Sequence, residues 1–393
     1  MTIKIIFWLS LLVIFYSYIG YGILLWMILK VKKVFKKQSK ENITEEFEPH
    51  VTIILASYNE AEIVKDKIKN CFELDYPSEK CQFYFIADGS NDSSTDIIAA
   101  NTGIKLFYQP ERAGKVAAIN RVMPFVTTAF VIFSDANTLL NKQCIRQIVK
   151  HYTDAKTGAV AGEKKVLDIN NYGDAAGAGE GLYWKYESFL KKLDADFYSV
   201  VGAAGELFSI RTELFEPTPT HVLLDDFIIS LTICQKGYRV AYEPNAFASE
   251  APSFSMQEEQ KRKIRISAGG FQSVVMLKSL LNIFKYGKLS FQYISHRVLR
   301  WVVCPFLLPV VFLSNFWLAA TYKAPIYGVL LCLQIIFYLA ALLSWLFSLK
   351  NIKVKMLYVP YYFVFMNICL YIGLWRFLGK KQTVLWEKAK RKT

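Results

Sequence analysis

The chain has 393 residues, of which 53% are apolar and 20% charged, and its formal net charge is +14. This length exceeds what one compact domain usually needs, and a mean hydropathy of +0.24 argues against a purely soluble protein. Nucleic-acid binding could use the positive charge. The lysines, however, are concentrated beside apolar segments, so we attribute the charge to membrane topology and to anionic membrane lipids, and expect no nucleic-acid partner.

The first element is an apolar run from Ile5 to Leu29, which is long enough to span a hydrocarbon core of about 30 Å. No small-residue cleavage site follows it, so a retained transmembrane helix is expected over residues 1–30. The basic linker over residues 31–48 predicts that the following domain lies in the cytosol. Seven cysteines without any Cys-X-X-Cys motif agree with a reducing compartment.

Strand-like and helix-like segments then alternate along the chain. Strands are expected at residues 51–58, 82–88, 104–109, 129–135 and 158–166, and helices at residues 60–72, 93–100, 114–122 and 142–152. This β-α-β-α order predicts a mostly parallel sheet covered by helices on both faces. A stretch at 170–193, rich in Gly, Ala and aromatic residues, is expected to cover a binding groove.

Apolar runs return after the sheet domain, which is expected to cover residues 49–285 with an interfacial segment. In the region 286–393, the runs 301–321 and 326–348 predict a helical hairpin, and a third run follows at 357–378. Three spans after a cytosolic domain would place the basic tail outside, whereas its lysines favour the inside. Either the third run lies along the interface or re-enters, or the charge rule fails here.

Acidic residues stand where an open α/β sheet presents its ligand-binding edge. Asp88 and Asp135 each end a strand-like run, and the pair Asp225–Asp226 follows later in the chain. A sheet-edge Asp can bind a nucleobase or ribose, and Asp135-Ala-Asn137 can offer oxygens to Mg²⁺ or Mn²⁺ that also holds a diphosphate. Asp226 could remove a proton from an attacking hydroxyl. A lone Asp at such a place is more often a cap or turn residue, but several in this order favour a site.

The motifs resemble those of family 2 glycosyltransferases, in the membrane-embedded branch that includes cellulose, hyaluronan and poly-N-acetylglucosamine synthases. The likeness is carried by VTIILASYNE, FIADGSNDSSTD, ERAGKVAAIN, SDANTLL, GAAGELFSIR, LLDDF and QKRKIRISAGG, with a weaker echo in the tail at QTVLWEKAKR. It implies an α/β domain of the GT-A fold, with a Rossmann-like, mostly parallel sheet, joined to an α-helical transmembrane region. It also implies a bacterial plasma (inner) membrane location, with the sheet domain in the cytosol.

The resemblance further implies roles for single residues. Asp226 would be the catalytic base, and Mg²⁺ or Mn²⁺ would be bound by Asp135 and Asn137. A nucleotide-sugar donor, expected to be a UDP-sugar, would be bound by Asp88, Lys115, Asn120, Asp135, Arg262 and Arg265, with Asp88 and Lys115 holding the uridine. The acceptor would be bound by Trp184, Asp225 and Ile266, although Trp184 could equally pack beneath the groove.

Two positions depart from the family pattern. Asn137 replaces a second Asp, which weakens metal binding unless the donor phosphates complete the coordination shell. Ile266 stands where processive members have Trp, which removes an aromatic platform for the acceptor sugar.

The implied activity is inverting transfer of a sugar to a hydroxyl of a glycan or lipid at the cytosolic membrane face. Ile266 leans toward an alternative, a single transfer to a lipid or polyprenyl-phosphate acceptor. An inactive nucleotide-sugar-binding scaffold is supported only by Asn137. A pure transporter would leave the cytosolic acids without a role. Export or assembly partners are left open.

Overall fold

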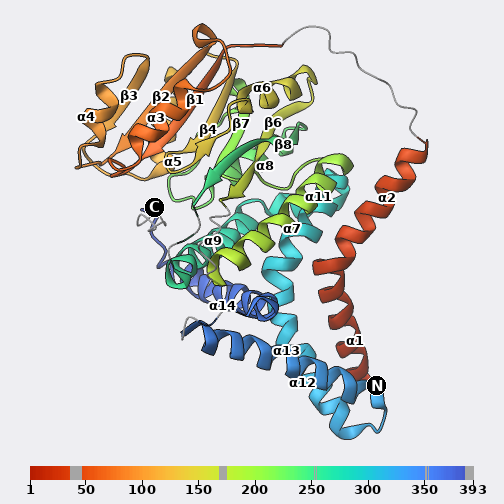
Figure 1. Ribbon diagram of the computed structural model, residues 1–393. Helices are drawn as coiled ribbons and strands as arrows, with labels where there is room; N and C mark the ends of the chain where they lie inside the picture. Colours follow the sequence, from red (N-terminus) through yellow and green to blue (C-terminus); the bar gives the residue numbers. More distant parts are fainter. Residues whose placement is uncertain are drawn as a thin grey trace.

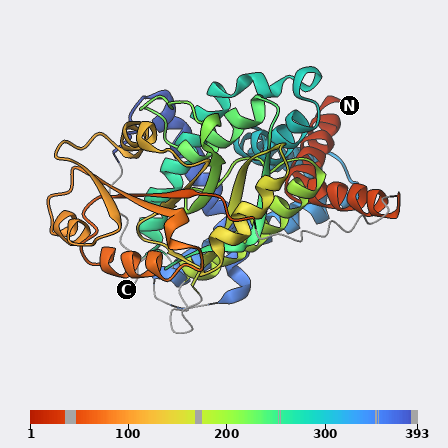
Figure 2. The same ribbon diagram turned by 90° about the horizontal axis from the view of Figure 1, so that it is seen from above.

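The computed structural model describes residues 1–35, 47–167, 175–251, 253, 255–349, 352 and 354–385. A sheet domain lies at one end of the molecule and the apolar helices at the other (Figure 1). The N-terminal helix lies on the opposite side of the molecule from strand β3, as both views show (Figures 1 and 2).

Eight strands form one sheet in the described part of the chain, in the order β3-β2-β1-β4-β7-β6-β8-β5. Their bounds are β1 (Val51–Ser57), β2 (Cys81–Asp88), β3 (Ile104–Gln109), β4 (Phe130–Asp135), β5 (Leu139–Leu140), β6 (Thr157–Val166), β7 (Leu207–Arg211) and β8 (Arg239–Glu250). β1 pairs in parallel with β2 and β4, β2 with β3, and β6 with β8, whereas β7 runs antiparallel to β4 and β6. The predicted mostly parallel α/β sheet is therefore confirmed.

Helices cover both faces of this sheet, because its central strands carry apolar side chains on both sides. In β1, Ile53 and Leu55 belong to one apolar layer and Ile54 to the other. The helices that cover the first face are α3 (Val64–Phe72), α4 (Ser94–Ala99) and α6 (Cys144–Val149), and those on the second are α5 (Lys115–Val122) and α8 (Asp225–Gln235). Strands buried on both faces read as continuous apolar runs, which is why this part was predictable.

Two long helices, α7 (Ala175–Phe197) and α9 (Met256–Met276), lie between the sheet and the apolar helices (Figure 1). α7 occupies most of the stretch expected to cover a groove, and residues 168–174 lie outside the described residues. α9 begins with a capping interaction in which the Ser255 side chain accepts from the backbone N–H of Glu258.

The apolar helices account for the remaining elements. The N-terminal helix comprises α1 (Thr2–Phe15), a π-helical turn η1 (Tyr16–Gly20) and α2 (Tyr21–Phe35), so it continues beyond the expected end at residue 30. Residues 36–46 of the expected linker lie outside the described residues. The second apolar region comprises α10 (Ile283–Tyr286), α11 (Lys288–Tyr293), the π-helical segment η7 (Ile294–Val303), α12 (Cys304–Thr321), α13 (Pro325–Leu349) and α14 (Tyr358–Leu378).

Of the residues described, four helical segments are long and apolar enough to cross a membrane: Thr2–Val34, Lys288–Thr321, Pro325–Leu349 and Tyr358–Leu378. The protein is accordingly a membrane protein. α12 and α13 form the expected hairpin, joined by a short connection between Thr321 and Pro325.

The last apolar helix, α14, runs alongside α9. Tyr362 near the start of α14 donates a hydrogen bond of 3.2 Å to Glu259 Oε1, and Phe377 near its end stacks on Phe271. These contacts pair the two helices over most of their length, and Figure 1 shows α14 next to α9. α14 therefore supports the helix that carries the predicted donor-binding arginines.

The segment after α14 returns to the sheet domain. A Cβ built on Gly114 would lie 3.7 Å from Val384 Cγ2, so this segment reaches the loop that precedes α5. Among the alternatives for the third apolar run, this contact fits a helix that lies along the interface or re-enters. The basic tail beyond residue 385 lies outside the described residues.

Gly373→Ala tests the close packing of α14 on α9. The added Cβ would lie 2.5 Å from Ser267 Cβ and 2.9 Å from the backbone nitrogen of Ala268. We expect the overpacking to lower the free energy of unfolding by about 1–3 kcal/mol, measured as thermal unfolding in detergent. The control is Gly328→Ala in α13, where a Cβ meets nothing within 4 Å and alanine favours the helix. Equal unfolding temperatures for both variants would contradict this packing.

Candidate active site

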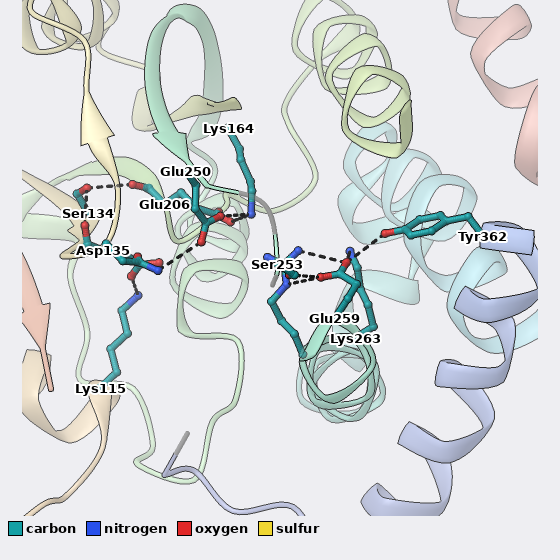
Figure 3. A network of polar contacts seen from close by, with 12 residues as sticks. Lys115, Ser134, Asp135, Lys164, Glu206, Glu250, Ser253, Glu259, Lys263 and Tyr362 are labelled. Carbon is teal, nitrogen blue, oxygen red and sulfur yellow. Dashed lines mark hydrogen bonds and ion pairs between the residues drawn. The ribbon is translucent and has the colours of Figure 1, made fainter. Parts of the chain in front are cut away.

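Three aspartates and one lysine meet at the sheet edge. Lys115 Nζ lies 2.7 Å from Asp135 Oδ1 and 3.9 Å from Asp225 Oδ2 (Figure 3 draws the first contact). A Cβ built on Gly205 would lie 3.4 Å from both Asp226 Oδ2 and Lys115 Nζ. Asp135 ends β4, Asp225 begins α8 and Lys115 begins α5, so three elements converge here. The structure thus brings together four of the residues that the sequence predicted for this site.

Burial and charge set the protonation of this group. Burial together with the neighbouring Asp225 raises the pKa of Asp226 to about 7, and Lys115 opposes this shift. Burial also raises the pKa of Asp135, again against the effect of Lys115. For Lys115 itself, burial lowers the pKa, but the charges of Asp135 and Asp225 outweigh it and the net shift is upward. Asp226 can therefore exchange a proton near neutral pH beside a lysine that stays charged.

The oxygen ligands at this edge fit a divalent cation that is shared with a diphosphate. Within the described ranges no three His, Cys, Asp or Glu side chains are arranged as a complete metal site. Mg²⁺ usually needs only one or two protein carboxylates when substrate phosphates supply other ligands. Asp135 offers such a carboxylate, and Asp225 Oδ2 is buried and has no hydrogen-bond partner in the described part of the chain.

Asn137 has a specific neighbour that explains its amide. Its Nδ2 lies 3.4 Å from Glu250 Oε1, to which it donates. An aspartate at this position would place a second carboxylate against Glu250. The neutral amide of Asn137, where the family has an aspartate, therefore avoids repulsion with the carboxylate of Glu250 on β8.

Asp88 shapes the loop that leads to Lys115. Its buried carboxylate accepts hydrogen bonds from the backbone N–H groups of Ala113 and Gly114, at 3.1 and 2.7 Å. Gly114 has a φ of +94°, which favours glycine. The ammonium of Lys115 points to Asp135, so the structure does not join Asp88 and Lys115 as one nucleoside-binding pair. The role of Asp88 toward the donor stays a prediction.

The structure does not bring Asn120 to the acids. Its side chain donates to Thr218 O at 2.7 Å and accepts from Thr218 N at 3.1 Å. This pair fixes α5 to the segment that precedes α8, and so helps to position Lys115 and Asp226. Asn120 thus has a structural role, because it binds the backbone of Thr218.

The two predicted arginines of α9 face different neighbours. Burial lowers the pKa of Arg265, while the charges of Asp225, Asp135 and Asp226 oppose this shift, so its guanidinium lies within electrostatic range of the acids. Arg262 Nε lies 3.1 Å from Glu259 Oε2, one turn earlier on the same helix. Arg265 is the arginine that the structure brings to the acids.

A second charge cluster, which the sequence analysis did not assign, adjoins the first. The buried ammonium of Lys164 lies 2.7 Å from Glu206 Oε1 and 2.5 Å from Glu250 Oε2 (Figure 3). Burial alone would raise the pKa of Glu206, but Lys164 holds that pKa well below its usual range. Ser134 Oγ donates to the backbone carbonyl of Glu206, which ties this cluster to β4 beside Asp135. The sequence feature that could have predicted this cluster is Glu206, the only acid in the motif GAAGELFSIR.

Of the predicted acceptor residues, Asp225 belongs to the acidic group at the sheet edge, whereas Trp184 lies on α7 and Ile266 on α9. The Trp184 ring lies 4.9 Å from Lys164 Nζ, so it borders the second charge cluster. Ile266 is half-buried on α9. Another aromatic ring beside α9 is Trp301, which a Cβ on Gly270 would approach to 3.0 Å and whose centroid lies 5.3 Å from that of Phe227. No motif pointed to Trp301, because it comes from η7 and meets α9 only in the folded chain.

Comparison with known proteins agrees with this geometry. Residues 52–217 match the model of Glycosyl transferase family 2. The poly-beta-1,6-N-acetyl-D-glucosamine synthase of Staphylococcus aureus (strain COL) is 25% identical over 247 residues, covering 60% of this chain and 57% of the relative. The synthase of Staphylococcus epidermidis is 25% identical over 252 residues, covering 61% and 58%. The chain thus spans somewhat more than half the length of these curated relatives.

A solved structure resembles nearly the whole chain. The mannosyltransferase PcManGT from Pyrobaculum calidifontis, in complex with GDP-Man and Mn²⁺, has a TM-score of 0.69 at 21% identity. The likeness covers 96% of this chain and 100% of that one, and it shows a shared fold.

The sheet order and the likeness to the solved structure show a GT-A fold, joined to apolar helices long enough to cross a membrane. Residues 52–217, which contain most of this sheet, are similar to glycosyl transferase family 2. The predicted fold is therefore confirmed, and the match over residues 52–217 supports the predicted family and class of enzyme.

Lys115→Met tests the charge balance at the sheet edge. The variant leaves three carboxylates without their shared ammonium, so we expect the free energy of unfolding to fall by about 3 kcal/mol. Added Mn²⁺ should raise the thermal unfolding temperature more in the variant than in the wild type, because the cation can replace the lost charge. The control is Lys69→Met, which removes an exposed lysine 3.9 Å from Glu73. The charge-balance account is wrong if Lys115→Met unfolds like the wild type and gains nothing from the cation.

Proposed function

We propose that the protein transfers a sugar, with inversion, from a nucleotide-diphosphate sugar to a hydroxyl of a glycan or lipid acceptor at the membrane surface. The observation that carries this proposal is Asp226, whose pKa is raised to about 7 beside Asp135 and Lys115 at the sheet edge. A carboxylate with this pKa suits a general base at neutral pH. The same edge offers positive groups for a departing diphosphate.

The chemistry follows from the positions of these groups. Unprotonated Asp226 takes the proton of the acceptor hydroxyl while its oxygen attacks the anomeric carbon of the donor. The bond from that carbon to the diphosphate breaks, and the nucleoside diphosphate leaves with the bonding electrons. Lys115 and Arg265 stabilise the charge that develops on the leaving group. Mg²⁺ or Mn²⁺, bound by Asp135 and Asn137, would supply further neutralisation of the diphosphate.

The comparisons support two donors to test first. The curated relatives are named as synthases of poly-beta-1,6-N-acetyl-D-glucosamine, and the solved mannosyltransferase holds GDP-Man and Mn²⁺. We infer a UDP-sugar, with UDP-N-acetylglucosamine the first candidate and GDP-mannose the alternative. Purified protein in detergent, incubated with each donor and with Mg²⁺ or Mn²⁺, should release the matching nucleoside diphosphate. Release from no donor would contradict the proposed function.

A short product or a single transfer is the second part of the proposal. Ile266 offers no extended ring face to hold a growing glycan. The alternative of an inactive scaffold rests on Asn137 alone, whose amide donates a hydrogen bond to Glu250.

The proposed location is a bacterial plasma (inner) membrane, with the sheet domain in the cytosol. The N-terminal helix, α12 and α13 would cross the bilayer, while α14 would lie at the interface along α9. This arrangement returns the segment around Val384 to the sheet domain, as its contact with Gly114 requires. It also places Lys380 and Lys381 on the same side as the domain, in agreement with the charge rule.

Asp226→Asn tests the base. The amide keeps the shape of the side chain but cannot accept a proton, so we expect kcat to fall by about 100-fold or more while donor binding survives. The wild-type rate should also fall as the pH drops below about 7, because protonation of Asp226 removes the base. The control is Asp154→Asn, which alters an exposed ion pair with Arg239 on the surface. Near-normal turnover by Asp226→Asn would remove this residue from the role.

Asp135→Ala tests the cation. We expect the variant to lose metal-dependent turnover and to bind the nucleoside diphosphate more weakly, because one carboxylate serves both. Isothermal titration with the nucleoside diphosphate, with and without Mn²⁺, measures this loss independently of turnover. Wild-type activity that persists in a strong chelator would rule out the cation.

A further inference from the structure

One buried lysine has no role in the mechanism above. Lys191 on α7 is 2% exposed, and its ammonium has no hydrogen-bond partner among the described residues. Burial lowers its pKa, and the charges of Glu163 and Glu206 oppose this shift. A buried ammonium without hydrogen bonds has lost its hydration without replacement, which is costly unless a ligand or water supplies acceptors.

Lys191 belongs to a group that we call the Trp184 cluster, made of Trp184, Lys164, Lys191 and Lys263. The three ammonium groups lie 4.9, 5.5 and 5.8 Å from the Trp184 ring, in that order. Lys164 is paired with two glutamates, and Lys263 lies 3.5 Å from Glu259 Oε1. Lys191 is therefore the cation of the cluster whose ammonium is left for another anion.

The Trp184 cluster lies next to the catalytic base. The backbone at Gly205 borders Asp226, and the following residue, Glu206, extends to Lys164. The charge of Glu206 also raises the pKa of both Asp226 and Lys191, so it lies within electrostatic range of both. An acceptor whose hydroxyl lies at Asp226 can thus place its next group at the cluster.

The cluster also lies on the membrane side of the sheet. Trp184 and Lys191 come from α7 and Lys263 from α9, the two helices between the sheet and the apolar helices (Figure 1). An amphipathic acceptor held at this level would have its polar head group near α7 and its chain among the apolar helices. An aromatic ring beside cations suits a sugar that is joined to an anion.

We propose that the Trp184 cluster binds a phosphate of the acceptor, next to the sugar whose hydroxyl attacks, as in a sugar linked to a membrane lipid through a diphosphate. This proposal rests on the proposed function and names the class of acceptor. Lys191 binds the phosphate, and Trp184 lies against the adjoining sugar. No bond to the phosphate forms or breaks, because the sugar hydroxyl remains the nucleophile and loses its proton to Asp226.

The test compares matched acceptors. One is a sugar joined to a polyprenyl chain through a diphosphate, and the second is the same sugar in a neutral alkyl glycoside. The third carries the diphosphate with a methyl group in place of the lipid. For the wild type we expect a KM at least about 10-fold lower for the first acceptor than for the second, the effect of one charged hydrogen bond.

Lys191→Met should raise the KM of the diphosphate-linked acceptors by about 10-fold or more and leave that of the neutral glycoside unchanged. Its release of nucleoside diphosphate from donor alone should match the wild type. Lys191→Arg should retain most of the preference, and the matched control is Lys192→Met, which alters the exposed neighbour on the same helix.

The outcomes distinguish failure of the phosphate site from failure of the proposed glycosyltransferase function. Equal KM values for the charged and neutral acceptors in the wild type would overturn the phosphate site even if Lys191→Met failed to fold. An unchanged KM in a folded Lys191→Met would overturn it as well. Equal use of the methyl diphosphate would retain the anion site but reject a lipid as its source. Absence of nucleoside diphosphate release from any donor would instead refute the proposed function itself.

Discussion

The structure depends on holding several carboxylates together at one buried edge of a sheet. Two like charges about 4 Å apart repel by about 4 kcal/mol at an effective dielectric constant of 20, so three aspartates there require nearby cations. Lys115 comes from α5, Lys164 from β6 and Arg265 from α9. No single element supplies this balance. The site therefore forms only where a helix from outside the sheet, α9, is brought against the edge.

The position of the membrane helices follows from a second buried carboxylate. Asp194 of α7 accepts a hydrogen bond of 2.5 Å from Tyr21 of the N-terminal helix and one of 3.1 Å from Gln292 Nε2. It also lies 2.5 Å from His296 Nδ1. The N-terminal helix and the helical segment Lys288–Thr321 thus both bind this buried acid of α7, and Leu25 of the N-terminal helix packs in the same cluster as α7. The N-terminal helix is consequently part of the support of α7 and more than a removable anchor.

The parts of the site that the sequence predicted are those fixed by local order along the chain. Asp88 and Asp135 were predictable because each ends a continuous apolar strand, and the carboxyl ends of parallel strands share one edge. The antiparallel strand β7 was not anticipated, since its partners β4 and β6 are chosen only by folding. The sequence also could not explain why Asn137 replaces an aspartate of the motif. Its partner Glu250 lies 113 residues later and meets it only in the folded chain. Charge partners at such separations leave no periodic signal.

Hydropathy alone also could not decide whether α14 spans the membrane. The packing of α14 on α9 explains why. Its mean hydropathy of 1.3 is the lowest of the four apolar segments, the others reaching 2.0 to 2.4. It buries Tyr362 and Asn367, and Gly373 allows its backbone to approach α9 closely. A helix with buried polar side chains and a glycine at its contact with α9 packs against protein on that face. Since α9 carries Arg265, the apolar helices hold an arginine at the acids, and the membrane-associated part of the chain completes the charge balance at the sheet edge.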